Sequence, residues 1–245
     1  MTGTLADAGR RIRTFVLDAL FPRRCAGCGR EGTVWCRACA DAFAPAPPPA
    51  ACPFCGTEGS DRACAACVRT HALDGLTALF AYADPRVRRM LTGWKYQGDA
   101  AYAGVISGWI GGRLSAGRVP GFLSISTPVP LHASRLRSRG FNQAETVSRA
   151  AAASLGLPHA DLLARVRKTA PQAKIAHAQR RAADLSGAFE FIPPLSKGRP
   201  GGVAAPERVL LCDDVFTTGA TMDAAAAALK AAGAGEVWGF AVAKG

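Results

Sequence analysis

Short apolar runs alternate with amphipathic stretches from residue 73 onward. Runs typical of strands occur at residues 76–82, 122–129, 187–191, 208–213 and 236–243. Apolar residues at helical spacing predict helices at about 85–95, 100–116, 143–155 and 219–232. Strands that alternate with helices in this way favour an α/β fold, with a mainly parallel sheet flanked by helices on both faces.

The first 24 residues have a different pattern. Residues 1–24 predict an amphipathic helix with apolar positions at Leu5, Ile12, Phe15, Val16, Ala19 and Leu20. We expect this face to pack on the body of the protein; a helix on a membrane surface is the alternative. Asp18 interrupts the apolar stretch, which a secretory signal would not tolerate. No apolar run approaches the roughly 20 residues of a membrane span, so we expect a cytoplasmic protein without integral membrane association.

Eight of the nine cysteines form four C-x-x-C pairs in the first quarter of the chain. The pairs are Cys25 and Cys28, Cys36 and Cys39, Cys52 and Cys55, and Cys64 and Cys67. Four thiolates complete the tetrahedron that Zn²⁺ prefers, which predicts two structural Zn²⁺ ions. Sequential pairing is the expectation, although interleaved pairs would satisfy the metal equally well. A redox dithiol or an iron–sulfur cluster does not require four matched pairs.

The cysteine region suggests a division of the chain. A proline-rich segment at residues 44–51 separates its two halves, and a Pro/Gly-rich surface loop is predicted at 193–207. We expect an N-terminal helix at 1–24, a double zinc-ribbon domain at 25–72 and the α/β domain at 73–245. The ninth cysteine, Cys212, lies within an apolar run and is predicted to be a small core residue.

Two adjacent carboxylates follow that apolar run. Asp213 and Asp214 would lie at the carboxyl end of a buried parallel strand, where open α/β sheets bind ligands. The next residues, 217–221, lead into a helix, so that their backbone N–H groups and the helix N-terminus can hold a phosphate. Gly219 would let the backbone approach the ligand closely. A sugar phosphate needs both features, because its vicinal hydroxyls donate to carboxylates while its phosphate accepts from the loop.

Other nucleotide-binding motifs are missing from the sequence. There is no G-x-x-x-x-G-K-[ST] loop and no G-x-G-x-x-G fingerprint, which argues against a Walker-type or dinucleotide site. A chance acidic pair at the end of a strand is the remaining alternative. The net charge of +12 favours polyanionic partners such as phosphates or nucleic acid, and it also aids solubility.

The string at residues 209–221 closely resembles the phosphoribosyl pyrophosphate (PRPP) signature of type I phosphoribosyltransferases. Together with the cysteine pairs, nearly the whole chain resembles the ComF family, which is competence-associated and phosphoribosyltransferase-like with an N-terminal zinc ribbon. "RGFNQ" (139–143) and "CDDVFTTGAT" (212–221) are the most specific segments. The resemblance implies a type I phosphoribosyltransferase fold, PRPP bound with Mg²⁺, and a role in DNA uptake and transformation.

The resemblance also implies site residues. The expected contacts of PRPP are Asp213, Asp214, Thr217, Thr218, Gly219, Ala220 and Thr221. The expected phosphate and pyrophosphate contacts are Arg135, Arg137, Arg139, Lys168 and Arg181, the last two at the ends of a loop that would close over PRPP. Asn142 and Gln143 would hold the start of the next helix. Asp184 stands where ComF relatives commonly carry Asn, and it is therefore left out of the site.

Neither a catalytic residue nor an acceptor site is evident in the sequence. A protein that binds single-stranded DNA, with a non-catalytic or regulatory PRPP pocket, is therefore an alternative function. Aromatic residues in the zinc region, such as Trp35 and Phe54, would suit that role if they are exposed, whereas packing of the small zinc core is the other interpretation. A third interpretation is a scaffold whose zinc domain docks a partner such as a competence helicase.

Overall fold

The computed structural model describes residues 23–97, 100–114, 119–167, 185–193 and 204–245. The chain forms two compact units, residues 1–45 and 46–245. The predicted N-terminal helix at 1–24 lies almost entirely outside the described residues. Within the described part of the chain, no helix combines the length and apolar character needed to cross a membrane.

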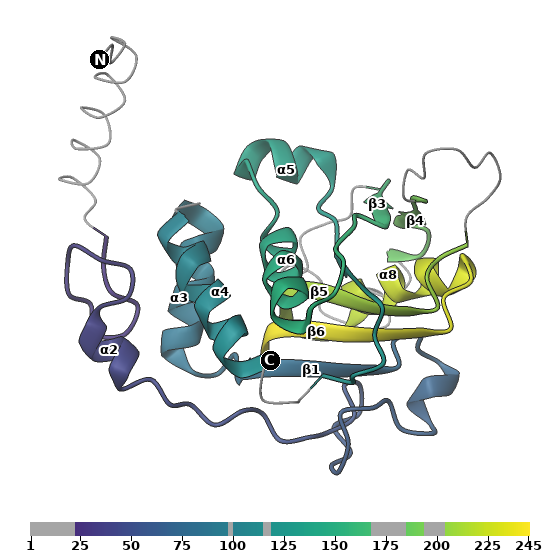
Figure 1. Ribbon diagram of the computed structural model, residues 1–245, viewed down its shortest axis with the longest axis horizontal. Coiled ribbons are helices and arrows are strands. Elements are labelled where there is room, and N and C mark those ends of the chain that lie inside the picture. The colour runs from purple at the N-terminus through teal and green to yellow at the C-terminus, as the bar shows by residue number, and fades with distance from the viewer. Residues whose placement is uncertain (1–22, 98–99, 115–118, 168–184, 194–203) are drawn as a thin grey trace, which may run out of the picture. The chain divides into compact units, whose positions relative to one another are not determined.

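Four parallel strands form the central sheet of the second unit. They are β1 (Gly75–Ala81), β2 (Ile125–Pro128), β5 (Arg208–Phe216) and β6 (Glu236–Lys244). Their order across the sheet is β1-β6-β5-β2 (Figure 1). β6 is buried along almost its whole length, as an apolar run in a parallel sheet covered on both faces should be.

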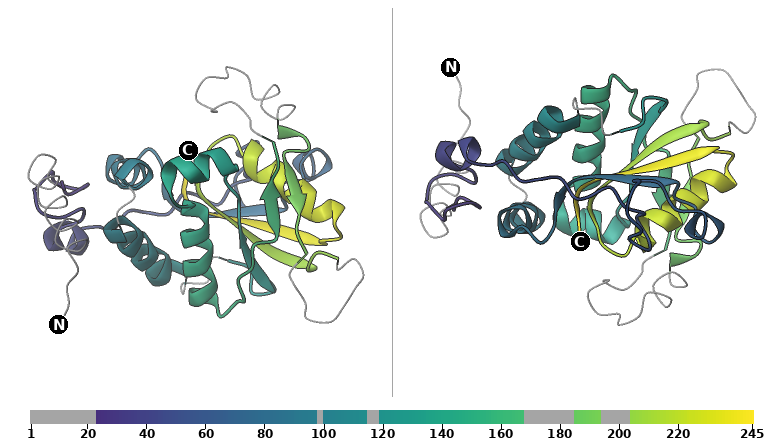
Figure 2. Two further views of the ribbon diagram at one scale, coloured as in Figure 1. Left: turned by 90° about the horizontal axis from the view of Figure 1, so that it is seen from above. Right: turned by 90° about the horizontal axis from the view of Figure 1, so that it is seen from below.

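Helices cover both faces of this sheet. α8 (Ala220–Ala231) packs on the face that carries Leu211, while α6 (Gln143–Leu155) packs on the face that carries Cys212. Figure 2 shows these two helices on opposite sides of the strands. α3 (Pro85–Gln97) and α4 (Ala100–Leu114) follow β1, and α4 packs against α6. The predicted fold class, a parallel sheet flanked by helices, is confirmed.

Close packing beneath α8 depends on one residue without a side chain. A Cβ atom at Gly239 of β6 would lie 2.6 Å from Sδ of Met222 in α8 and 2.9 Å from Cδ1 of Leu76 in β1. Glycine at this position therefore lets α8 approach the sheet closely. Cys212 is fully buried, as predicted, and its Sγ lies 3.4 Å from Oγ of Ser126.

The short elements between β2 and β5 differ from the prediction. The run at 187–191 forms β4 (Phe189–Phe191), which pairs antiparallel with β3 (Leu163–Arg165) in a separate two-stranded sheet. No strand was predicted at the position of β3, because three residues are too few to establish an alternating pattern. α5 (Ala133–Arg139) was also not predicted.

The two halves of the cysteine region belong to different units. The first unit contains Cys25 to Cys39 and the short helix α2 (Arg37–Asp41). The second half, which contains the short 3₁₀ helix η1 (Cys67–Arg69), belongs to the same unit as the sheet. Its backbone pairs with the start of β1, since Ala63 N–H donates to the carbonyl of Asp74 and Leu76 N–H donates to that of Asp61. The two compact units thus divide within the proline-rich segment.

Candidate functional site

The acidic pair extends β5 beyond the end of one of its neighbours. β5 pairs with β2 only as far as Cys212, opposite Pro128, but it pairs with β6 as far as Phe216. Asp213 and Asp214 therefore lie at the carboxyl edge of the sheet. Both line a cavity of about 510 Å³. This edge is the expected ligand-binding position of an open parallel sheet.

The two carboxylates repel one another at this edge. Burial, followed by the negative charge of Asp214, raises the pKa of Asp213 well above its ordinary value. The N–H of Asp214 donates to Oδ1 of Asp213 at 2.8 Å, and Nζ of Lys95 lies 3.6 Å from Oδ2 of Asp214. Acceptors held in this way suit the neighbouring hydroxyl groups of a ligand, which donate hydrogen bonds to them.

The loop between β5 and α8 forms another part of the wall of the cavity. All five predicted loop residues, 217–221, line it. Gly219 is the N-cap of α8 and has a φ of 77°, in the left-handed region that favours glycine. Because glycine has no side chain to accept from the N–H groups of the first turn, these groups suit an external anion, and the helix dipole adds to the attraction.

α5 decides which of the predicted arginines reach the cavity. Arg135 and Arg139 are four residues apart, lie on one face of the helix and line the cavity. Arg137 is exposed and is not among the described residues that line it. The alternation of arginines in the sequence suggested three equivalent contacts, but helical spacing separates the middle one. Lys168 and Arg181 lie outside the described residues.

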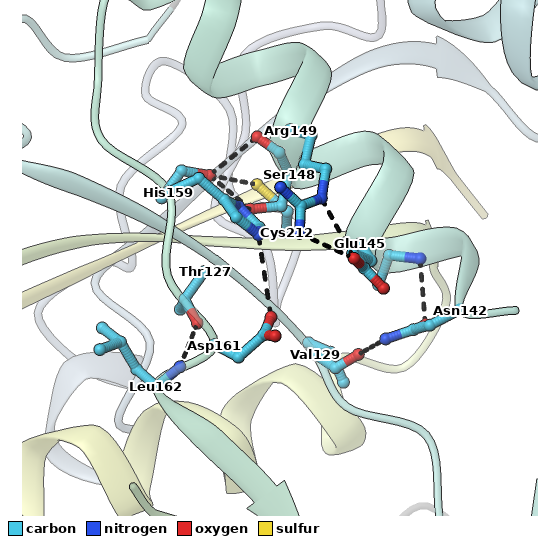
Figure 3. A network of polar contacts seen from close by, with 12 residues as sticks. Thr127, Val129, Asn142, Glu145, Ser148, Arg149, His159, Asp161, Leu162 and Cys212 are labelled. Atoms are coloured by element: carbon cyan, nitrogen blue, oxygen red, sulfur yellow. Dashed lines mark hydrogen bonds and ion pairs between the residues drawn. The ribbon is translucent and has the colours of Figure 1, made fainter. Parts of the chain in front are cut away.

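A network of polar contacts fixes the end of β2 against the start of α6 (Figure 3). Asn142 is the N-cap of α6: its Oδ1 accepts from the N–H of Ala144 at 3.2 Å, and its Nδ2 donates to the carbonyl of Val129 at 3.1 Å. Deeper in the core, Oγ of Ser148 lies 2.7 Å from Oγ of Ser126 and 2.9 Å from Nδ1 of His159. These contacts hold the start of α6 at the cavity.

Gln143 is a candidate ligand contact. The sequence predicted only that it would hold the start of α6. It is 2% exposed and lines the cavity. Its Oε1 accepts from Nη1 of Arg139 at 2.5 Å, while its buried Nε2 has no hydrogen-bond partner among the described residues. An unpaired buried donor costs about 1–3 kcal/mol, and an oxygen of a ligand would remove that cost. The "RGFNQ" string was a signal, but only the structure shows the missing partner.

The cysteines form two groups of four along the sequence. One group is Cys25, Cys28, Cys36 and Cys39, and the other is Cys52, Cys55, Cys64 and Cys67. The sulfur atoms within each group lie within 4.8 Å of one another. The groups are built alike: the N–H of Cys36 donates to Sγ of Cys25 at 3.3 Å, and the N–H of Cys64 donates to Sγ of Cys52 at 3.4 Å.

The ionisation of these thiols suits a divalent cation. Burial opposes ionisation of Cys25, but backbone N–H groups, first that of Cys28, lower its pKa to about 6. The hydrogen bond with Cys36 is the main reason that the pKa of Cys39 rises to about 12. In the second group, Thr57 lowers the pKa of Cys55 to about 6. Four thiolates cannot form together unless a cation offsets their charge, and Zn²⁺ fits this all-sulfur donor set.

Comparison with models of protein families finds no match, but individual proteins are similar to the chain. Competence protein ComFC of Streptococcus pneumoniae is 29% identical over 163 residues, which are 66% of this chain and 65% of that protein. Competence protein F of Haemophilus influenzae is 35% identical over 117 residues, 46% of this chain and 48% of that protein.

These similarities support an assignment of the chain to the ComF family. The matched regions span about two thirds and about half the length of these two relatives. Both relatives are named as competence proteins, in agreement with the resemblance found in the sequence. The two cysteine groups of the chain are consistent with zinc ribbons.

Proposed function

We propose that the protein binds PRPP at the carboxyl edge of its sheet. One observation carries the proposal: the acidic pair, the loop at 217–221 and the arginines of α5 all line the same cavity. PRPP has vicinal hydroxyls, a 5′-phosphate and a pyrophosphate, and each of these groups has a chemical match in that wall. The volume of about 510 Å³ lies within the range of about 300–1,000 Å³ that is usual for small-molecule sites.

We propose a separate role for each group of residues in the wall of the cavity. Asp213 and Asp214 would accept from the ribose hydroxyls, and the loop at 217–221 would hold the 5′-phosphate. Arg135 and Arg139 would face the pyrophosphate. Mg²⁺ would arrive with PRPP and neutralise charge on its phosphate oxygens. In a transfer reaction, a nucleophile would bond to the anomeric carbon while the bond from that carbon to pyrophosphate breaks, and these residues would contribute positioning and electrostatic stabilisation.

We propose a cytoplasmic role in DNA uptake for this site, since both relatives are named as competence proteins. Binding of single-stranded DNA is the second candidate function. It is favoured by Tyr96, which is 82% exposed and lines a second cavity of about 270 Å³ together with Lys95, Arg139 and Phe141. An exposed ring in a cavity that cationic side chains also line suits a stacked base. The aromatics first considered for this role are engaged elsewhere, because Trp35 packs edge-on against Phe43 and Phe54 stacks on His71.

Calorimetric titration with PRPP, with and without Mg²⁺, tests the first candidate. We expect saturable binding that requires Mg²⁺ in the wild type and is lost in the Asp213→Asn/Asp214→Asn variant. Asp161→Asn is the control, because this carboxylate is mostly exposed and does not line the cavity. Absence of PRPP binding by the wild type would refute the proposal.

Titration with single-stranded DNA at two salt concentrations tests the second candidate. Binding through phosphates should weaken steeply as salt is raised, and Tyr96→Ala should weaken it further. DNA binding that survives in the double aspartate variant would mean that the acidic pair does not take part in it. PRPP binding without any DNA binding would support the first candidate alone.

A further inference from the structure

Phe54 connects the second cysteine group to the candidate phosphate loop. It lies between the two cysteines of the third C-x-x-C pair, so the geometry of that group fixes its backbone. Its ring stacks on the ring of His71, with centroids 3.6 Å apart and planes 6° from parallel. Its ring also meets the ring of Phe216, the last residue of β5, edge-on at 6.4 Å. Phe54 therefore supports the residue from which the loop departs.

The same ring also contacts the loop itself. A Cβ atom at Gly219 would lie 3.1 Å from Cε1 of Phe54 and 2.5 Å from Cζ of Phe216. Both distances are shorter than ordinary van der Waals contacts, so these two rings lie directly against the backbone of the N-cap of α8. Movement of Phe54 would change the surface on which Gly219 rests.

The far end of the loop is held by the segment that follows the second cysteine group. Asp223, in the first turn of α8, has Oδ2 at 2.9 Å from Nδ1 of His71. Its Oδ1 accepts from the N–H groups of Ala72 and Leu73 at 2.7 and 3.1 Å. The N–H of His71 in turn donates to the carbonyl of Cys67, the last cysteine of the group, at 2.9 Å. Both ends of the loop thus depend on the second group.

The first cysteine group has no aromatic residue at the position equivalent to Phe54. It has Gly27 where the second group has Phe54, and a Cβ atom there would lie 2.4 Å from Sγ of Cys39. No side chain fits that position without rearrangement of the group. The first group also belongs to the other compact unit. The two groups therefore offer a matched comparison, because the second has Phe54 and the first has glycine at the same position.

We propose that the second cysteine group, through Phe54, His71 and Asp223, positions the loop at 217–221, so that metal bound at this group raises the affinity of the cavity for a phosphate group. Metal fixes the backbone of the group, and a loop that is already ordered binds its ligand without the cost of ordering. These three are positioning residues, since none of them lines the cavity. The identity of the phosphate ligand rests on the proposed function, whereas the link between metal and loop does not.

Two cysteine variants test the role of the metal. Cys28→Ser and Cys55→Ser each remove an exposed thiol at the same position of its group. Zinc content should fall by about half in both. Only Cys55→Ser should weaken the binding of inorganic phosphate and PRPP measured by calorimetry, by about tenfold, and should speed hydrogen exchange at residues 217–223 in the ligand-free protein. Equal effects of the two variants, or no effect of Cys55→Ser, would overturn the proposal.

Phe54→Leu tests the connection while all cysteines remain. It should retain both metal ions, weaken phosphate binding by about three- to tenfold and speed hydrogen exchange of the loop, because the variant loses the aromatic contacts of the ring with His71 and Phe216. Phe43→Leu, which removes the aromatic contact near the first group, is the control. Hydrogen exchange needs no ligand, so a wild type that fails to bind PRPP would refute the proposed function and leave this test intact. Unchanged exchange in Phe54→Leu would refute the link.

Discussion

At the scale of the residue, Gln143 makes a sharp prediction because its buried amide nitrogen has no partner among the described residues. Gln143→Glu keeps an oxygen that can accept from Arg139, but it replaces the donor with a negative charge. We expect phosphate and PRPP to bind about 10- to 100-fold more weakly, the usual loss for a hydrogen bond to a charged group. Gln97→Glu adds the same charge at an exposed position outside the main cavity and should have a much smaller effect. Comparable losses in both variants would show that charge alone, and not the donor, matters.

Asp213 should oppose the stability of the ligand-free fold. A carboxyl whose pKa is raised by folding destabilises the protein above its unfolded pKa, and the cost is complete above its folded pKa. Asp213→Asn should therefore raise the free energy of unfolding at neutral pH by the order of 1 kcal/mol, while PRPP binding is lost. The advantage should shrink as pH falls through the raised pKa, because the protonated aspartate is then also uncharged. Urea unfolding at several pH values measures this difference in the free energy of unfolding. A variant that is less stable than the wild type at neutral pH would contradict the raised pKa of Asp213.

Sequence reasoning succeeded at residue scale where local chemistry decides the outcome. The residues that follow β5 predicted the turn into α8 with Gly219 in it, because a change from strand to helix depends on neighbours in the chain. The sequence analysis treated Arg135, Arg137 and Arg139 alike because α5 was not predicted. Helical spacing places Arg135 and Arg139 at the cavity and Arg137 on another face of the helix. The unpaired nitrogen of Gln143 could not be predicted, because a missing partner is a property of the packed structure.

At the scale of the element, the turn from β5 into α8 depends on Gly219. Gly219→Ala would strain a residue with φ of 77° and place a Cβ atom 2.5 Å from Phe216. We expect a loss of about 2–4 kcal/mol in the free energy of unfolding. Gly156→Ala is a matched control, since Gly156 caps α6 with φ of 66° but has no atom within 4 Å of its Cβ position. Its cost should be about 1 kcal/mol. Equal costs measured by urea unfolding would mean that the aromatic contact contributes nothing.

Element length explains which parts of the fold the sequence predicted. The long strands β5 and β6 and the helices α3, α4, α6 and α8 have apolar patterns that repeat often enough to identify their type. β3 and β4 have three residues each, so their pairing depends on contacts far along the chain. The division of the cysteine region between the two units has the same origin. It is set by backbone pairing with β1 and by the ring of Phe54, neither of which the spacing of the cysteines reveals.

At the scale of the whole molecule, the two units should respond differently to removal of metal. Among the described residues of the first unit, 23–45, the buried apolar residues beyond the cysteines are Ala26 and Val34, so we expect metal to hold most of the fold of this part. The second unit has an extensive core on both faces of its sheet. A strong chelator should therefore abolish hydrogen-exchange protection at residues 23–45 while β5 and β6 remain protected. Residues 217–223 should show an intermediate response, because they depend on the second cysteine group but follow a strand that does not. Mass spectrometry of hydrogen exchange measures the order in which these three regions lose protection. Loss of protection in β5 and β6 at the same chelator concentration as in residues 23–45 would mean that the sheet itself requires metal.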